Sequence, residues 1–377
     1  MALIPDSLIL EFLLRLPLKS LVRFKCIDKF WYSLISHLDF IYTQLNRAKS
    51  ENNRCLMFSC LLDHDHQHSA IQFFSIKDNH EPAVLEHIAP VSLDSYHVLP
   101  SCNGLVCFYG SHSGIHVCNP STRNLMTLLD GDSTRFRLLS CGFGFDQRSR
   151  TYKVIKITQP LSVDNDFKIE VLTMSPGGWW RTVRYKPHFR FLNRQAPVFA
   201  SGYFYWITSD ATNGNSGSTI VKFDVENEVF GIIYPPESIS LKNWHMFNLV
   251  ELGGELCLVD LDFELENKRR MDIWFLKGSV KDHQWVQETI VHQSEPLDAT
   301  RPVAFHGGEI LVYGFIKGLD YLNWYNLQTR LFRPLKTIGI PSPYSHVSAH
   351  VESLVPLITN DDYSPTNLHN GTVFSSE

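Results

Sequence analysis

The first 48 residues carry apolar side chains at the spacing of an α-helix. Apolar residues recur four positions apart in two runs, Leu8, Phe12 and Leu16, then Phe30, Leu34 and Leu38. Residues four apart lie on one helical face. Pro5 followed by Asp6 provides a helix start and Leu16-Pro17 an end, because proline suits a first helical turn but disfavours helical geometry in the residue before it. The pattern predicts three or four short helices, one from Pro5 to Leu16 and others over 18–25, around Trp31 and over 39–48.

These helices contain more apolar side chains than so few short elements can bury among themselves. Eighteen Ile, Leu, Val, Phe or Trp residues lie between Ile4 and Leu38. A module of under about 50 residues also gains little net stability from a single core. The surplus indicates either a partner protein or an extensive contact with the rest of the chain, as in a helical cap on a larger domain.

Residues 54–357 show the pattern of strands and turns. Runs rich in Val, Ile, Phe, Tyr and Trp alternate with clusters of Gly, Asn, Asp, Pro and Ser. Four strands are introduced by a glycine turn, at Asn103-Gly104, Ser201-Gly202, Gly253-Gly254 and Gly307-Gly308. Their spacings of 98, 52 and 54 residues indicate a repeat of about 50, whose missing copy falls near Tyr152.

A second turn recurs in the same region. A strand ends in Asn or Asp and another returns after a short polar turn, at Asn119, Asp146, Asp224 and Asn326. Such side chains accept hydrogen bonds from the backbone just ahead and so initiate turns. A repeat near 50 residues with about four strands predicts a kelch-like β-propeller of about six blades, with paired β-sandwiches as the alternative. Residues 358–377 are polar and without periodicity, which predicts a disordered tail.

Composition narrows the classes of protein. Hydrophobic residues make up 44% and charged residues 19% of the 377, as in a folded soluble protein. The net charge of −5 argues against a protein that coats nucleic acid. We expect no membrane span or secretory signal, because charges and proline interrupt the apolar start of the chain. The eight cysteines form no CxxC pair, which favours reduced thiols and a cytoplasmic location, with the nucleus as the second.

The first 45 residues resemble the F-box, the adaptor motif of SCF ubiquitin ligases. The matching run ends at Ile35 and reads IPDSLILEFLLRLPLKSLVRFKCIDKFWYSLI. Asp28 and Phe30 depart from the cysteine and the small polar residue that are common at their positions. The resemblance implies an F-box over residues 1–48.

The remainder resembles the F-box-associated domain of plant F-box proteins, and is similar to S-locus F-box proteins and their S-locus F-box-like relatives. The matching segments are SCNGLVCFY at 101–109, NPSTR at 119–123, GFGFD at 142–146, YKVIKI after it, PVFASGYFYWI ending at Ile207, IVKFDVENEVF at 220–230 and HVESLVPL at 350–357. The resemblance implies a second domain over residues 54–357. These segments indicate the blade scaffold and do not identify a target.

The resemblance implies that the helices dock onto a Skp-type linker, which bridges to a cullin and its RING partner. The residues at the family's linker-binding and packing positions are Pro5, Leu8, Leu16, Pro17, Leu21 and Trp31. Leu16, Pro17 and Trp31 are the first choices because large anchors carry most interface energy. Trp31 can equally belong to the internal core.

A direct enzyme or metalloprotein would need a convergent set of reactive side chains. His64, His66 and His68 alternate and could contact one ion, but they lie at a predicted hairpin tip where polar residues are expected. No GxSxG, P-loop, HExxH or GxGxxG motif is present. We therefore expect no catalytic residues, no metal and no cofactor.

The remaining candidates have simpler structural interpretations. Cys102 and Cys107 could suggest a nucleophile, but a strand over 105–109 would bury Cys107. The acidic residues Asp260, Asp262 and Glu264 fit a solvated strand edge. The aromatic groups at Trp179-Trp180, Tyr203 to Trp206 and Trp324-Tyr325 fit a blade core better than a stacking site for sugars or bases.

The sequence thus predicts the non-catalytic substrate-recognition subunit of an SCF ubiquitin ligase, which presents a protein target for ubiquitination and proteasomal degradation. A basic S-ribonuclease is a permissible target, because residues 49–377 carry 28 basic against 35 acidic residues. The candidate contact segments are 63–69, 159–167, 186–196, 209–218 and 262–270, which are polar and lie outside the matching segments. The alternatives are a propeller lectin or enzyme with a helical cap, and an F-box scaffold that degrades nothing.

Overall fold

The computed structural model describes seventeen stretches of the chain. They are residues 5–50, 54–65, 68–77, 84–87, 96–110, 114–128, 136–161, 167–183, 189–191, 196–210, 218–239, 247–262, 269–278, 283–292, 299–316, 319–335 and 346–357. The predicted tail at 358–377 lies outside these residues.

Four helices open the chain, as the apolar spacing predicts. They are α1 (Asp6–Leu14), α2 (Leu18–Phe24), α3 (Lys29–Ser36) and α4 (Leu38–Ser50). Proline precedes α1 and α2, where it fixes the backbone at the start of each helix. Asp28 caps α3, because its Oδ1 accepts a hydrogen bond from the Trp31 backbone N–H at 2.9 Å. The departure from the F-box pattern at Asp28 therefore supplies a helix cap.

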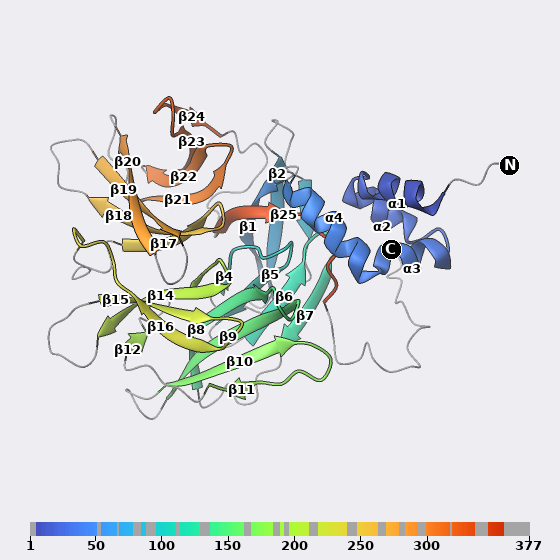
Figure 1. Cartoon of the computed structure of the whole chain (residues 1–377), viewed down its shortest axis with the longest axis horizontal. Coiled ribbons are helices and arrows are strands. Elements are labelled where there is room, and N and C mark those ends of the chain that lie inside the picture. Colours follow the sequence, from blue (N-terminus) through green and yellow to red (C-terminus); the bar gives the residue numbers. More distant parts are fainter. Residues whose placement is uncertain are drawn as a thin grey trace.

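Six antiparallel sheets follow and stand around a common axis (Figure 1), which confirms a six-bladed propeller and excludes paired sandwiches. Blade 1 contains β1 (Arg54–Asp65), β2 (His68–Lys77), β3 (Val84–His87) and β25 (His346–Val351). Blade 2 contains β4 (Tyr96–Val98), β5 (Val106–Gly110), β6 (Gly114–Asn119) and β7 (Asn124–Leu128). Blade 3 contains β8 (Phe136–Asp146), β9 (Thr151–Pro160), β10 (Lys168–Met174) and β11 (Arg181–Thr182).

The other three blades repeat this plan. Blade 4 contains β12 (Phe189–Phe191), β13 (Val198–Ala200), β14 (Tyr203–Asp210), β15 (Ser218–Asp224) and β16 (Val229–Ile233). Blade 5 contains β17 (Phe247–Leu252), β18 (Glu255–Asp262), β19 (Arg269–Gly278) and β20 (His283–His292). Blade 6 contains β21 (Ala299–His306), β22 (Glu309–Ile316), β23 (Leu319–Asn326) and β24 (Phe332–Pro334). In blade 4, β12 and β13 both pair with β14 and together take the place of one first strand.

The two ends of the propeller sequence meet in blade 1. Strand β25 pairs antiparallel with β1, from Arg54 opposite Val351 to Ser59 opposite His346. The last strand of the chain thereby becomes the first strand of the first blade. This pairing closes the ring, because the end of the chain completes the blade that its beginning starts.

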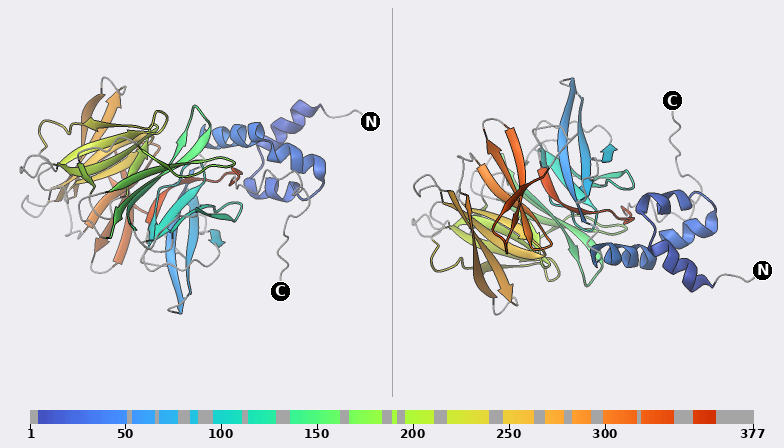
Figure 2. Two further views of the ribbon diagram at one scale, coloured as in Figure 1. Left: turned by 90° about the horizontal axis from the view of Figure 1, so that it is seen from below. Right: turned by 90° about the horizontal axis from the view of Figure 1, so that it is seen from above.

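Strand order places the connections at two opposite ends of the propeller. Helix α4 leads into β1, which is the second strand of its blade, so second strands begin on the side of the helices. Because neighbouring strands are antiparallel, turns from first to second and from third to fourth strands lie at this helical end. Connections from second to third strands, and from one blade to the next, lie at the opposite, distal end. Figure 2 shows the helices standing out on one side only.

The predicted glycine turns join first to second strands at the helical end. Asn103 and Gly104 have φ of 53° and 83°, and Gly253 and Gly254 have φ of 67° and 95°. A two-residue hairpin turn with positive φ at both positions matches the twist of its strands and favours Gly and Asn. The repeat near 50 residues therefore reflects a hairpin turn between the first and second strands of blades 2, 4, 5 and 6.

The predicted Asn and Asp turns are also confirmed. At Asn119, Asp146, Asp224 and Asn326, Oδ1 accepts hydrogen bonds from the backbone N–H groups two and three residues ahead. Three of these turns join third to fourth strands. The Asp146 turn instead joins β8 to β9, where other blades have a glycine turn. This substitution explains why the repeat copy near Tyr152 has no glycine.

An ion cluster ties blade 3 to blade 4 at the helical end. Lys153 Nζ lies 3.2 Å from Asp146 Oδ2 and 3.1 Å from Glu228 Oε1, and donates a 2.6 Å hydrogen bond to the Val225 carbonyl. Burial favours a higher pKa for Asp146, but hydrogen bonds from Ser149 and Lys153 hold its pKa below the usual value. Arg181 of β11 also pairs with Glu228 at 2.7 Å. The short turns of this end are thus linked across blades.

Helices and propeller share one hydrophobic core. Helix α4 buries Phe40, Ile41, Gln44, Leu45 and Ala48. This core is continuous with buried residues of blades 2 and 3 and with Leu354, Val355 and Leu357 after β25. The Tyr42 and Phe145 rings lie 6.1 Å apart, and Lys49 Nζ donates a hydrogen bond to Asn103. The helical part is therefore packed firmly against the propeller.

Candidate protein-docking surfaces

The helices carry an unusual share of the exposed apolar surface. Half of the fourteen large apolar residues that are exposed within the described stretches lie in the first 38 residues. They are Leu8, Leu10, Phe12, Ile27, Phe30, Tyr32 and Leu38. Leu8 and Phe12 are each 59% exposed, although they stand one turn apart on α1 in a strongly apolar sequence. We call these seven residues the helical apolar surface, and their number favours docking of a partner protein.

The predicted linker-contact residues fall into three groups. Pro5, Leu8 and Pro17 are exposed, Leu16 and Trp31 are half-buried, and Leu21 is completely buried. Leu21 is buried in the core shared by α1, α2 and α4, so it takes a packing position and offers no surface of its own to a linker. The apolar spacing could not separate it from Leu8, because a helix in this module packs on more than one side.

Trp31 belongs partly to the core. Its ring stacks on Phe24 at a centroid distance of 5.9 Å and meets the edge of Phe30 at 5.6 Å. Phe30 itself is 58% exposed, and Ile27 and Tyr32 are exposed beside it. The motif did not mark Ile27, Phe30 and Tyr32, although the first two stood in the apolar surplus of the sequence. The helices therefore expose a second group of apolar side chains besides Leu8 and Phe12.

One ion cluster fixes α1 against α4. Glu11 Oε1 accepts hydrogen bonds from Arg15 Nη2 at 2.8 Å and from Arg47 Nη1 at 3.3 Å. These two hydrogen bonds lower the pKa of Glu11, and the one from Arg15 has the larger effect. Because Arg47 lies on α4, the pair orients the helix that presents Leu8 and Phe12.

The five predicted target-contact segments all open at the distal end. Four of them connect second to third strands, between β1 and β2, β9 and β10, β14 and β15, and β18 and β19. The fifth, 186–196, connects blade 3 to blade 4. Most of their residues lie outside the described stretches. The described strand ends that flank them lie at the end of the propeller that faces away from the helices.

The alternative sites receive no support from the described residues. Strands β1 and β2 form the predicted hairpin, with Asp65 opposite His68, while His66 lies outside the described stretches. No cluster of three metal-ligating side chains occurs in the described part of the chain. Cys107 is fully buried on β5, and burial raises its pKa well above the usual value, so its thiol is a packed and inert group.

Two structural interpretations of the sequence are corrected. Asp260 does not lie on a sheet edge, because β18 pairs with β17 on one side and β19 on the other. Trp179 is not core: it is 71% exposed in the connection between β10 and β11. Phe204, Tyr205, Trp206, Trp324 and Tyr325 are buried, as expected of blade residues.

Among the described helices, none combines the length and apolar character that crossing a membrane requires.

Known proteins match the chain over nearly its whole length. Residues 55–357 match the family described as "F-box associated beta propeller domain". The chain is 24% identical to F-box protein CPR1 of Arabidopsis thaliana over 374 residues, which cover 92% of this chain and 87% of that protein.

Two further Arabidopsis thaliana proteins are similar. F-box protein At5g65850 is 28% identical over 305 residues, covering 76% of this chain and 71% of that protein. F-box/kelch-repeat protein At3g23880 is 25% identical over 334 residues, covering 86% of this chain and 88% of that protein.

Proposed function

Since the chain belongs to the plant F-box proteins that carry an F-box associated beta propeller domain, we propose that it is the substrate-receptor subunit of an SCF ubiquitin ligase. In this role the helices dock onto a Skp-type linker, which bridges to a cullin and its RING partner. The propeller holds a protein target, and the chain forms no covalent bond itself.

The helical apolar surface is the observation that carries this proposal. Leu8, Phe12 and Phe30 expose more than half of their side-chain area although the propeller offers a core that already buries Phe40, Ile41 and Leu45. Each such side chain gains roughly 1.5–3 kcal/mol when it is fully removed from water. A partner that covers these residues recovers this free energy, and half-exposed Trp31 and Leu16 would lie at the margin of its contact.

Topology supports target capture at the distal end. The helical end consists of short turns that hydrogen bonds and ion pairs tie together, and the longer connections lie at the other end. A target held there faces away from the linker, on the side free of the helices. The ligase then acts by proximity, because it raises the local concentration of the target near the charged ubiquitin-conjugating enzyme.

Co-purification of the full chain with a plant Skp-type linker and cullin tests the proposal. The variant Leu8→Asp/Phe12→Asp should lose the linker, because it places two charges in the centre of the contact. Both residues are exposed, so the melting temperature should change by no more than about 2 °C.

Val286→Asp/Leu331→Asp is the matched control, since these two residues are exposed on the propeller. It should keep the linker. If the intact chain binds no linker, or if both double variants bind equally well, the adaptor role is wrong. Removing the helices altogether is a poorer test, because it would uncover the core that they share with blades 2 and 3.

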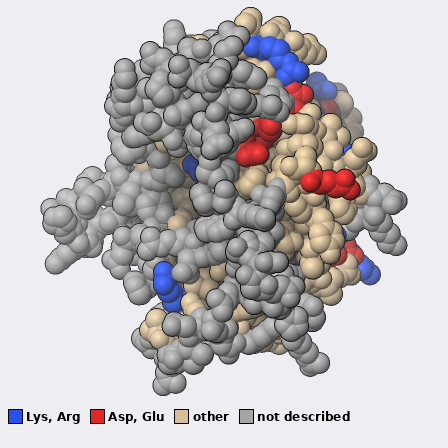
Figure 3. All heavy atoms as spheres, turned by 90° about the vertical axis from the view of Figure 1, so that its left-hand side faces the viewer, with Lys and Arg blue, Asp and Glu red and all other residues tan. Residues whose placement is uncertain are grey.

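We further propose a basic protein, such as a secreted S-ribonuclease, as the target. The net charge of −7 on residues 49–377 supports it, since opposite net charges raise the rate of encounter. Figure 3 shows side chains of both signs scattered over the described part of the distal side, so selectivity would rest on the connecting segments. Binding of an S-ribonuclease to the purified chain at low salt is the expected result, and failure to bind any such protein of its own species would exclude this target.

Degradation is a separate step of the proposal. A receptor that promotes ubiquitination should shorten the half-life of its target in cells, and Leu8→Asp/Phe12→Asp should restore it. An unchanged half-life with intact linker binding would instead support an F-box scaffold.

A further inference from the structure

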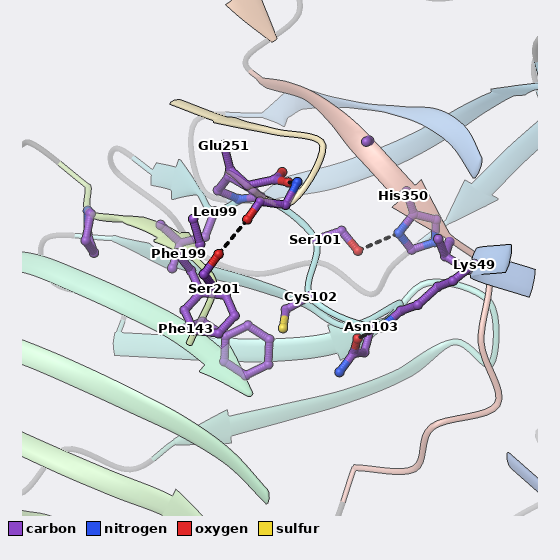
Figure 4. A pocket seen from close by; sticks show the side chains of 16 residues that line it. Lys49, Leu99, Ser101, Cys102, Asn103, Phe143, Phe199, Ser201, Glu251 and His350 are labelled. Carbon is purple, nitrogen blue, oxygen red and sulfur yellow. Dashed lines mark hydrogen bonds between the residues drawn. The ribbon is translucent and has the colours of Figure 1, made fainter. Parts of the chain in front are cut away.

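A cavity follows the axis of the propeller. One part, of about 200 Å³, lies at the helical end, where Lys49 of α4 and Asn103 reach its rim (Figure 4). A second part, of about 290 Å³, is lined by the first strands of the blades, β4, β13, β17, β21 and β25. The two parts are adjacent, because both are lined by Pro100, Ser101, Pro197, Glu251 and Ala349. Their combined size is that of a small-molecule site.

The cavity contains a cation that no described carboxylate neutralises. Arg301 of β21 lines the second part, and its guanidinium lies 5.4 Å from the centre of the Tyr313 ring. No ion pair of Arg301 occurs among the described residues. Arg301 remains exposed to solvent at the cavity, and arginine binds carboxylates through two parallel hydrogen bonds. Arg301 thus provides an anchor for an anion.

Strand β25 places a row of polar side chains along the same cavity. His346, Ser348 and His350 alternate along the strand and so share one face. Ser348 and His350 are buried, and Ser348 Oγ and Nε2 of both histidines have no hydrogen-bond partner within the described structure. His350 is oriented by its Nδ1, which lies 2.8 Å from Ser101 Oγ (Figure 4). Buried polar atoms are nearly always satisfied in folded proteins, so this row offers hydrogen-bonding groups to water or to a ligand in the cavity.

The two histidines act as neutral groups. Burial lowers the pKa of His350 to about 4, and burial together with the Arg301 charge lowers the pKa of His346 to about 3. A neutral imidazole both donates and accepts hydrogen bonds. The positive charge of this part of the cavity is therefore concentrated on Arg301.

The lining also has an apolar component, beside further polar residues such as His97 and Asn248. It includes Val98, Pro197, Val198, Leu249, Pro302 and Val303. Glu251 is the acidic residue of the lining, and its carboxylate accepts a hydrogen bond from the Gly254 backbone within its own turn. An apolar wall with a few placed polar groups is the usual composition of a small-molecule pocket.

We infer that the central cavity of the propeller binds a small organic acid. Its carboxylate pairs with Arg301, its polar edge meets the row on β25, and its apolar body lies against the prolines and valines. This site is independent of linker docking, because none of its lining residues belongs to the helical apolar surface.

Benzoate and its uncharged isostere benzamide test the inference by calorimetry on the full chain bound to a Skp-type linker, or on the chain alone. Benzoate should bind at least ten-fold more tightly than benzamide. Arg301→Gln should lower the affinity for benzoate at least ten-fold, whereas Arg301→Lys should keep part of that affinity. Ser348→Ala should lower the affinity for benzoate a few-fold. Arg137→Gln, which removes an exposed arginine from β8 outside the cavity lining, should bind as the intact chain does.

The inference is overturned if benzoate does not bind at millimolar concentration, if benzamide binds equally well, or if Arg301→Gln and Arg137→Gln behave alike. Binding of inorganic phosphate without benzoate would also overturn it, since the apolar wall would then play no part. Should Arg301→Gln not fold, the comparison of Arg301→Lys and Ser348→Ala with the intact chain decides the matter. Linker binding in the same samples shows whether the proposed function stands, whatever the outcome for the cavity.

Discussion

Asn119 joins two distant parts of the chain through one buried side chain. Its Oδ1 accepts hydrogen bonds from the backbone N–H groups of Ser121 and Thr122, and its Nδ2 donates to the carbonyls of Ser353 at 3.0 Å and Val355 at 2.8 Å. Asn119→Ala should lower the free energy of unfolding by about 2–4 kcal/mol, because it leaves buried backbone groups without partners. Urea denaturation measures this change.

Asn326→Ala is the control for this prediction. Asn326 makes the same turn, with the backbone N–H groups of Gln328 and Thr329 at 3.0 and 2.8 Å, but does not bind the segment after β25. Replacing Asn326 by Ala should lower the free energy of unfolding by only about 1 kcal/mol. Equal losses in the two variants would show that the contacts with Ser353 and Val355 contribute nothing.

His350 makes stability depend on pH. Burial lowers its folded-state pKa to about 4 from an ordinary value of 6.5. Between these pH values the unfolded chain binds a proton that the folded chain does not. The free energy of unfolding therefore has its full value above about pH 6.5 and falls as the pH drops toward 4. His346, with a pKa of about 3, acts in the same direction. The melting temperature should therefore fall between pH 7 and pH 5.

A histidine variant isolates this contribution. His350→Asn should flatten the fall in melting temperature over this range, whereas replacement of the exposed His283 should leave the slope unchanged. A slope that is the same in all three proteins would rule out His350 as a source of the acid sensitivity.

At the scale of elements, two strands of neighbouring blades approach closely where β8 has glycine. A Cβ at Gly144 would lie 2.5 Å from the Phe199 ring of β13, and one at Gly142 would lie 2.8 Å from Pro197. This contact gives the GFGFD segment a physical meaning, since larger residues would separate blades 3 and 4. Gly144→Ala should lower the free energy of unfolding by about 1–3 kcal/mol.

Gly231→Ala on β16 provides the comparison. Its added Cβ would meet the end of the Lys222 side chain at 2.9 Å, and that flexible chain can move aside. Thermal unfolding should show a clear loss for Gly144→Ala and a change within about 0.5 kcal/mol for Gly231→Ala. A larger loss at Gly231 would contradict this account of blade packing.

At the scale of the whole molecule, ring closure depends on the last strand. β25 supplies six residues of pairing to β1, and the segment after it fills the core between α4 and blade 2. A chain that ends at residue 345 should not fold cooperatively, because both blade 1 and the shared core would be incomplete. A chain that ends at Leu357 should keep the melting temperature of the full protein. Differential scanning calorimetry distinguishes these outcomes, and a large loss in the longer chain would show that residues 358–377 contribute to the fold.

The sequence predicted the local features well, because they depend on contacts within a few residues. Turns form at Asn119 and Asp224 because their side chains accept hydrogen bonds from the backbone just ahead. A turn forms at Gly254 because a residue without a side chain adopts positive φ easily. The four helices follow from apolar spacing and from two prolines. The sequence also identifies Asp146, which interrupts the glycine repeat, as a turn residue. It does not show that this turn joins the first and second strands of the blade.

Burial and accessibility were decided by the tertiary structure. Leu21 and Phe12 are equally apolar and lie on neighbouring helices, but Leu21 is enclosed and Phe12 is exposed, because only packing against α4 determines which side faces inward. Trp179 is also exposed, although its neighbour Trp180 packs against the shared core. The row on β25 and Arg301 meet in one cavity only because the chain closes on itself. Sequence determined which turns and helices form, since these are short-range effects. The tertiary structure decided which apolar residues of the helices stay exposed, and it formed the cavity from residues that lie up to hundreds of positions apart in the chain.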